Sequence, residues 1–508
     1  MPSLTSLRDL MREGQAVDMH RPWARAVVSR VVWERTIGLL EEGWCGLLGL
    51  WGAGQFVHMA LIGIERDGPA ILSLACEDHR FPSVGRRHAP AIRLERAVRD
   101  LLGLEPEGLA DTRPWLDHGT WRRRHPLGMA GDAGALDRYV FLPVEGEGLH
   151  QIGVGPIHAG IIEPGHFRFT ANGETIVRLE ERLGYVHKGI ESLMAGRSLE
   201  RAAVLAGRVS GDSTVAYALA FSRAVEAALG CEPPQRAVWL RALMAELERL
   251  ANHFGDLGAV CNDAAFAMLH AQFGYMREHV LRAADQCFGH RLMMDRIAPG
   301  GVVCDLPPDG PAAIAALIAH IRAHFPELVE LYDNTASLQD RTVATGVLSP
   351  VLARQFAPGG YVGRASGRAF DARRTPGYPP YDTLKFDIPV LEEGDVNARL
   401  WIRIREVEQS VGIIDQILQQ LPGGATRGRL PVGSATHAGE GVALVEGFRG
   451  DVLVWVQLAD DGRIERCHLR DPSWFQWPLL EAVIEGNIVA DFPLCNKSFN
   501  CSYSGHDL

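Results

Sequence analysis

The sequence has 508 residues, of which 47% are hydrophobic, and a formal net charge of −11. This length is sufficient for two or more domains with a large core, and the negative charge argues against a broad nucleic-acid-binding face. Nine cysteines are scattered without a C-x-x-C pair, so we expect a reducing compartment rather than a disulfide framework. The amino terminus, MPSLTSLRDLMREG, carries charges where a signal peptide needs an apolar core.

The first predicted unit spans residues 1–125 and mixes strands with helices. The run RAVVSRVV indicates a strand, VWERTIGLLEEG indicates a helix, and a second helix is expected from Arg93 onward. The uncharged run over residues 43–64 is long enough to cross a membrane as a helix. However, it contains six glycines, and a similar run, PAILSLACED, follows the turn ERDG. We therefore favour two sheet strands.

Residues 126–150 have the composition of a linker, and residues 151–508 form a second, mainly helical unit. Alternating apolar and polar residues over 151–180 predict strands joined by a hairpin turn at Asn172-Gly173. Strands return over 441–470, with a second turn at Asp460-Asp461-Gly462. Helical patterns cover residues 189–205, 212–229, 236–257, 264–288, 311–332, 395–421 and 474–485.

One stretch, Gly155–Tyr217, gathers titratable residues around glycine and proline turns. It contains GPIHAGIIEPGHFRF, then RLGYVHKGIESLMAGRSLERA, and ends on RVSGDSTVAY. His158, Glu163, His166 and His187 lie here, between an apolar run and a long helical pattern.

The stretch resembles the region that forms the nickel site in large subunits of membrane-bound, energy-converting [NiFe] hydrogenases of the formate-hydrogenlyase and hydrogenase-4 type. Those proteins are relatives of the 49 kDa-type subunit of respiratory complex I. Weaker similarities follow in the family's order, among them YVHKGIE, GRASG and EGFRG. The resemblance implies an α+β fold: a small α+β domain, then a mainly helical domain of the large-subunit type with small peripheral antiparallel sheets.

The resemblance also locates the family's four nickel-binding cysteines, and this chain has none of them. The family motif R-x-C-G-x-C-x-x-x-H corresponds to RVSGDSTVAY, with Ser210 and Ser213 at the cysteine positions. The second pair falls on Ser502 and Gly505 in the tail DFPLCNKSFNCSYSGHDL. Nickel and low-spin iron need soft, deprotonated sulfur ligands, whereas a hydroxyl is hard and glycine offers no donor. We therefore expect no metal and no cofactor bound by this chain itself.

Two alternatives stay open for this region. Cys495, Cys501 and His506 could hold another metal, although their spacing, C-x5-C-x4-H, fits no standard zinc pattern. Otherwise the substituted positions are small buried residues that fill an emptied cavity. A genuine [NiFe] hydrogenase would require nickel to be held by ligands that cannot hold it.

A proton relay is the second feature that the resemblance implies. Glu163 in EPGH matches the glutamate thought to pass protons from a nickel thiolate in the family, and His158 and His166 beside it can titrate near neutral pH. Buried carboxylates and imidazoles are candidates for such relays. The alternative is structural: Glu163 and His158 cap turns and pair with Arg208. Further candidates for the same cavity are Asp212, Tyr217 and Arg449.

Two further features of the sequence relate to complex I. Complex I binds the quinone head group in this cavity through a histidine and a tyrosine, and the corresponding positions here are Ile162 and Leu205, so the quinone site is not present in its usual form. The end of the first unit resembles the 30 kDa-type subunit of complex I and implies a docking role. The residues that carry this second resemblance are Glu95, Arg96, Asp100, Gly103, Asp111, Arg113 and Trp115.

Taken together, the resemblance implies a subunit of a complex I-like or hydrogenase-related oxidoreductase at the cytoplasmic face of the membrane. Its partners would be an iron–sulfur small subunit with [4Fe-4S] clusters, a ferredoxin-like subunit and antiporter-like membrane subunits, with a quinone as a candidate acceptor. Nucleic acid is not an expected partner. The alternative is a non-catalytic scaffold in such a complex.

Overall fold

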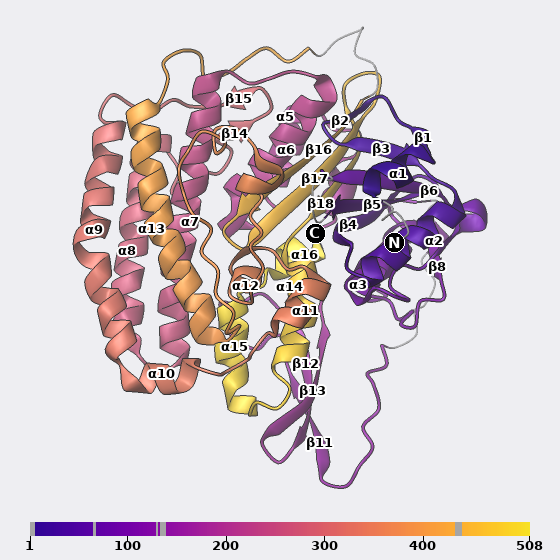
Figure 1. Cartoon of the computed structure of the whole chain (residues 1–508), viewed down its shortest axis with the longest axis horizontal. Coiled ribbons are helices and arrows are strands. Elements are labelled where there is room, and N and C mark those ends of the chain that lie inside the picture. The colour runs from indigo at the N-terminus through magenta and orange to yellow at the C-terminus, as the bar shows by residue number, and fades with distance from the viewer. Residues whose placement is uncertain (1–5, 64–67, 129–130, 133–138, 432–438) are drawn as a thin grey trace.

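The computed structural model describes residues 6–63, 68–128, 131–132, 139–431 and 439–508. Long helices form a bundle on one side of the molecule, the amino-terminal unit lies on the other side, and a sheet near the carboxyl end separates them (Figure 1). A three-stranded sheet projects from the base. This mixture of helices and small sheets confirms the predicted α+β class.

The amino-terminal unit is a five-stranded sheet, in the order β1-β3-β6-β5-β4, packed with helices. The run at 43–64 forms the antiparallel strands β4 and β5 rather than a membrane helix, as expected from its glycines. Strand β2 leaves this unit and pairs with β16. The elements are α1 (Leu7–Arg12), β1 (Gln15–Ala16), β2 (His20–Arg21), β3 (Ala24–Val27), α2 (Arg30–Glu41), β4 (Cys45–Ala53), β5 (Phe56–Gly63), β6 (Ala70–Ala75), β7 (Arg80–Pro82), α3 (Ile92–Leu102) and β8 (Glu105–Glu107).

The projecting sheet is antiparallel, in the order β11-β12-β13. The predicted hairpin is present, because Asn172 pairs with Thr175 across the turn. The loop between β11 and β12 carries residues 155–165, which include His158 and Glu163. The strands of this region are β9 (Arg123–Arg124), β10 (Gly131–Asp132), β11 (Leu149–Val154), β12 (His166–Asn172) and β13 (Thr175–Arg182).

The predicted long helices are present, with one correction. The helix expected over 189–205 is two helices, because the chain turns at Gly196 with a left-handed φ of 72°, and the Ser198 side chain then caps the second helix. The elements are α4 (Ile190–Met194), α5 (Leu199–Ala206), α6 (Thr214–Leu229), α7 (Gln235–Asp263), α8 (Ala267–Phe288), β14 (Ile297–Ala298), β15 (Gly301–Val302), α9 (Gly310–Asn334), α10 (Ala336–Thr342), α11 (Pro350–Phe356), α12 (Gly360–Arg364) and α13 (Val396–Gln420).

The carboxyl-terminal part adds a four-stranded sheet, in the order β18-β17-β16-β2, and three helices. Helix α6 packs closely on this sheet: a Cβ at Gly441 would lie 1.9 Å from the Ala224 carbonyl oxygen. The tail after α14, for which we expected no helix, forms two short ones. The elements are β16 (Glu440–Gly447), β17 (Gly450–Leu458), β18 (Ile464–Arg470), α14 (Ser473–Val483), α15 (Phe492–Phe499) and α16 (Tyr503–Asp507).

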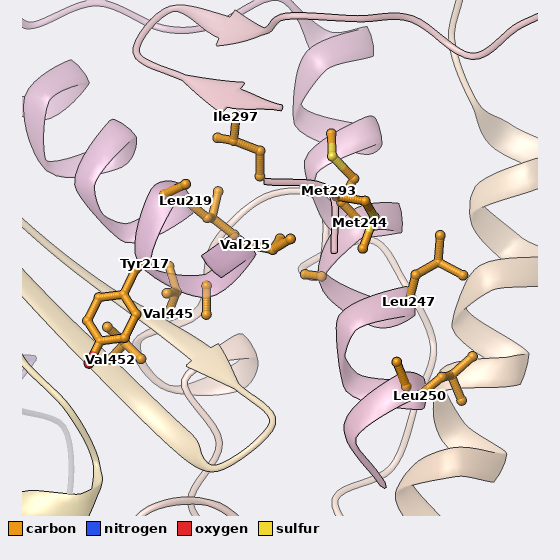
Figure 2. Packing of buried hydrophobic residues seen from close by; sticks show 14 of the residues in the cluster. Val215, Tyr217, Leu219, Met244, Leu247, Leu250, Met293, Ile297, Val445 and Val452 are labelled. Carbon is orange, nitrogen blue, oxygen red and sulfur yellow. The ribbon is translucent and has the colours of Figure 1, made fainter. Parts of the chain in front are cut away.

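Two large apolar clusters hold these parts together. The first fills the space between α6, α7 and the β16–β17 hairpin, where Tyr217, Leu247 and Val445 are among the buried side chains (Figure 2). The second joins the amino-terminal unit to β12 and α14–α16, and includes Trp115 and Trp477. Burying side chains of this size contributes roughly 1.5–3 kcal/mol each. The amino-terminal unit therefore shares its core with the carboxyl-terminal tail, and the unit boundary at residue 125 remains a prediction.

Helix α9 is the one helix in the described part of the chain with the length and apolar composition to cross a membrane. It packs against α8 and α13 in the bundle. A single such helix is weak support for a membrane span, because a helix of a bundle can meet the same two criteria.

Candidate functional site

The fold brings together the four positions that the resemblance assigns to nickel ligands. Ser210 and Ser213 flank the turn that leads into α6, and Ser502 is the N-cap of α16, with Gly505 in its first turn. All four are buried. We call this group the serine–glycine site.

An ion pair occupies the α6 side of the serine–glycine site. Arg449, from the β16–β17 turn, donates to both oxygens of Asp212, with Nη1–Oδ1 at 2.9 Å and Nη2–Oδ2 at 2.7 Å. Ser210 Oγ donates to Asp212 Oδ1 at 2.5 Å, and Ser213 Oγ lies 3.2 Å from the same oxygen. Burial opposes ionisation of Asp212, but Arg449 and the two hydroxyls outweigh it and lower the pKa of Asp212 to about 2. Both hydroxyls are thus committed to a carboxylate.

The α16 side is closed by a second carboxylate. Asp471 Oδ2 accepts a hydrogen bond from the Tyr217 hydroxyl at 2.6 Å, and burial together with this carboxylate raises the pKa of Tyr217 well above its usual value. A Cβ at Gly505 would lie 2.4 Å from Asp471 Oδ2 and 2.8 Å from Ser502 Oγ. Position 505 therefore has no room for a cysteine side chain in this arrangement.

These residues do not fit a nickel–iron group. The donors are protonated hydroxyls held in hydrogen bonds, and a guanidinium lies among them, whereas the group requires soft thiolates. Within the described ranges, no three or more histidine, cysteine, aspartate or glutamate side chains are arranged to hold a metal ion. Burial raises the pKa of Cys495 to about 11 and that of Cys501 well above its usual value. His506 is held by Trp115 and Asp507. The alternative in which Cys495, Cys501 and His506 hold another metal therefore has no support here.

The structure brings two of the predicted relay residues to the rim of the serine–glycine site. Glu163 Oε2 accepts a hydrogen bond from the Ser504 backbone N–H at 3.0 Å, and His158 Nε2 lies 3.4 Å from the Tyr503 hydroxyl. Both contacts are to the first turn of α16. Glu163 is exposed, which corrects the expectation of a buried carboxylate, because the 155–165 loop lies at the surface.

The other two predicted relay residues lie elsewhere. His166 Nδ1 lies 3.3 Å from the Gly155 carbonyl oxygen and its ring packs on Phe141; burial lowers its pKa. Arg208 forms a bidentate ion pair with Asp295, at 2.9 and 2.7 Å. The alternative in which Arg208 pairs with Glu163 and His158 is therefore wrong.

The YVHKG segment anchors the end of the chain to the site. His187 Nδ1 lies 2.7 Å from the Asp507 carbonyl oxygen. The Asp507 carboxylate accepts hydrogen bonds from the Gly184 and Val186 backbone N–H groups, and Lys188 Nζ donates to the Val209 carbonyl oxygen at 2.6 Å. His187 thus holds α16 in place rather than facing the serine–glycine site.

Sequence reasoning missed one residue of this site, Glu248. Its carboxylate accepts hydrogen bonds from Val215 N at 2.7 Å and Ala216 N at 3.0 Å, in the first turn of α6. Burial outweighs these two donors and, with the nearby Asp212 charge, raises the pKa of Glu248 to about 8. A small cavity, about 10 Å³, lies beside Glu248, Asp212 and Asn252. The motif Glu246-x-Glu248 was visible in the sequence, but nothing in it shows which glutamate faces the site.

The two positions that the resemblance assigns to quinone binding are apolar here. Ile162 is partly buried in the 155–165 loop, and Leu205 is buried in α5. Ile157 and Ile161 in the same loop are 86% and 91% exposed. The rim beside Glu163 is therefore an apolar surface with a carboxylate and an imidazole next to it.

Comparisons with known proteins show which family the chain resembles. Residues 264–432 and 428–507 match the family described as respiratory-chain NADH dehydrogenase, 49 Kd subunit, and residues 188–257 match nickel-dependent hydrogenase. Formate hydrogenlyase subunit 5 of Escherichia coli (strain K12) is 33% identical over 440 residues, which cover 84% of this chain and 77% of that protein. Hydrogenase-4 component G of the same strain is 31% identical over 465 residues, 89% and 80% of the two chains. A relative from Dehalococcoides mccartyi (strain ATCC BAA-2266 / KCTC 15142 / 195), which is a component of NADH-quinone oxidoreductase, is 32% identical over 343 residues, 67% and 93% of the two chains.

Proposed function

This chain belongs to the family of the respiratory-chain NADH dehydrogenase 49 kDa subunit and the nickel-dependent hydrogenases, and from that premise we propose that it is a subunit of a membrane-associated oxidoreductase complex that works without a nickel–iron site of its own. Electrons arrive through a partner iron–sulfur subunit and pass to a quinone-like acceptor, and this transfer drives ion translocation in membrane partners. The names of its relatives, hydrogenase components and NADH-quinone oxidoreductase subunits, support the oxidoreductase class.

The Arg449–Asp212 pair is the observation that carries the proposal. It ties up the hydroxyls of Ser210 and Ser213, and Asp471 fills the space at Gly505. The cavity beside Asp212 and Glu248, at about 10 Å³, is too small for a quinone ring. The acceptor therefore binds at the rim, against the exposed isoleucines of the 155–165 loop, where His158 and Glu163 are available to supply or accept protons.

The first test is metal analysis of the complex purified from its native membrane, scored per copy of this chain. We expect iron in multiples of four, from partner [4Fe-4S] clusters, and no nickel. Stoichiometric nickel would overturn the proposal and restore a hydrogenase.

The second test separates catalysis from scaffolding. We expect Glu163→Gln to lower turnover of the assembled complex with a soluble quinone at least tenfold, because the amide cannot carry a proton. Glu174→Gln, an exposed glutamate at the β12–β13 turn, is the matched control and leaves turnover unchanged. Unchanged turnover in both variants, with assembly intact, would favour the non-catalytic scaffold.

A further inference from the structure

A second cavity, of about 260 Å³, lies between α6, the start of α7, the segment 378–381 and β16. It shares no lining residue with the small cavity at the serine–glycine site. Its walls are largely apolar, with Leu219, Pro233, Val238, Ala242, Pro379 and Val442 among the lining residues. Its volume lies just below the range of roughly 300–1,000 Å³ typical of drug-sized ligands, so it suits a small molecule.

Three polar side chains on the lining of this cavity, Glu226, Arg241 and Tyr381, are already paired. Glu226 forms a bidentate ion pair with Arg241, at 2.6 and 3.0 Å, and accepts a hydrogen bond from the Gly300 N–H at 2.7 Å. The Tyr381 hydroxyl donates to Glu246 at 2.7 Å. Arg223, on the same lining, differs from these three.

The Arg223 guanidinium lies over the Tyr378 ring, 4.7 Å from its centroid. Its Nε is buried without a hydrogen-bond partner, and throughout the described ranges no carboxylate pairs with it. The Arg223 side chain is partly buried, and this desolvation lowers the pKa of Arg223. The cavity thus contains a cation without a counter-ion, packed on an aromatic face and surrounded by apolar walls.

We propose that this cavity is a binding site for a small amphipathic carboxylate, which pairs with Arg223 and lays its apolar body against Leu219, Val238 and Pro379. A guanidinium matches a carboxylate in a planar, bidentate geometry. Arg223 supplies one unpaired positive charge, whereas Glu226 and Glu232 on the same lining would repel an anion. The site therefore suits a monoanion and disfavours a phosphate dianion. This site is separate from the proposed redox function and does not depend on it.

The test uses the purified full chain and a matched pair of probes, benzoate and benzamide, measured by isothermal titration. They have nearly the same shape, but only benzoate carries the charge. We expect benzoate to bind one to one and benzamide at least tenfold more weakly. Arg223→Gln should weaken benzoate binding at least tenfold and leave benzamide binding unchanged. Arg354→Gln, at an exposed arginine on α11, should change neither.

A second measurement covers the case in which Arg223→Gln fails to fold. Phenylglyoxal, which modifies arginine, is applied to the wild-type chain with and without benzoate, and peptides are identified by mass spectrometry. We expect benzoate to protect Arg223 and not Arg354. No benzoate binding, equal binding of the two probes, binding retained in a folded Arg223→Gln chain, or modification of Arg223 that benzoate does not reduce would each overturn the proposal.

Discussion

Two glutamates on one turn of α7 show how differently this protein uses buried charge. Glu246 faces Arg373 at 3.1 Å and Arg249 at 3.4 Å, and these arginines outweigh its burial and lower its pKa. Glu248, two residues on, faces the serine–glycine site. Among the described residues its hydrogen-bond partners are two backbone N–H groups, and its pKa is raised to about 8. Residues two apart on a helix point to nearly opposite sides.

The environment of Glu246 is a buried ion-pair network that joins α7, α12, the segment 371–373, α13 and β16. Its members alternate in charge and are almost completely buried, and each carboxylate has at least one arginine partner. The network consists of Glu246, Arg249, His253, Arg364, Asp371, Arg373, Glu406 and Glu446. The comparison teaches that arginine partners keep the pKa values of Glu246, Asp371 and Glu406 low despite their burial, whereas Glu248, which has backbone donors instead, has a pKa raised toward neutral.

The largest expected effect is in the network. Arg364 Nη2 lies 2.5 Å from Glu406 Oε1 and Nη1 lies 2.8 Å from Glu446 Oε1, so Arg364→Met leaves two buried carboxylates without their main cation. We expect the free energy of unfolding to fall by about 3–5 kcal/mol, measured by denaturant titration of the full chain.

Arg354→Met is the control for this change. It removes an exposed arginine and should alter the free energy of unfolding by about 0.5 kcal/mol or less. Equal small effects in both variants would mean that the network does not hold the fold together.

A smaller effect is expected from steric crowding in the serine–glycine site. Gly505→Ala places a Cβ against Asp471 and Ser502, and overpacking of this kind lowers the free energy of unfolding by about 1–3 kcal/mol. Gly211→Ala lies next to Ser210, but its Cβ would have no neighbour within 4 Å, so it should be neutral. If thermal unfolding shows Gly505→Ala to be as stable as Gly211→Ala, position 505 has room for a side chain and the steric argument against a cysteine there is wrong.

Much of the fold could be predicted from local patterns. Glycine content distinguished the strands β4 and β5 from a membrane helix, and the 3.6-residue period located the long helices of the bundle. The break at Gly196 was missed because the apolar period continues across it. The helices α15 and α16 were missed because each is short and held mainly by tertiary contacts, such as the Glu163–Ser504 hydrogen bond.

The site could be predicted only where residues are neighbours in the sequence. Ser210, Asp212 and Ser213 were found together, but Arg449 is 237 residues from Asp212, and Asp471 is 254 residues from its partner Tyr217. No local pattern shows that Arg208 pairs with Asp295 rather than Glu163. Ion-pair partners at such separations are chosen by the packing of the elements that carry them.

The last prediction concerns the pH dependence that sets Glu248 apart from Glu246. The folded-state pKa of about 8 lies above the value of about 4.3 for an unfolded glutamate, so the unfolded chain releases the proton first. The contribution of Glu248 to stability is therefore fully present below about pH 4.3 and is lost as the pH rises toward 8. In that window Glu248 makes the unfolding free energy fall with pH by at most about 1.4 kcal/mol per pH unit.

Glu248→Gln removes this titration, so the unfolding free energy of the variant should fall less steeply between pH 5 and 8 than that of the wild type. Burial also raises the pKa of Glu95 and that of Glu446 to about 7. The pH dependence of the wild-type unfolding free energy therefore has several sources. The informative quantity is the difference in slope between the wild type and Glu248→Gln. Glu246→Gln is the matched control: the pKa of Glu246 is lowered, so its loss should destabilise the fold without flattening the slope in this window. Parallel curves for the wild type and Glu248→Gln would show that Glu248 is ionised throughout, like Glu246, and would remove the distinction between the two faces of α7.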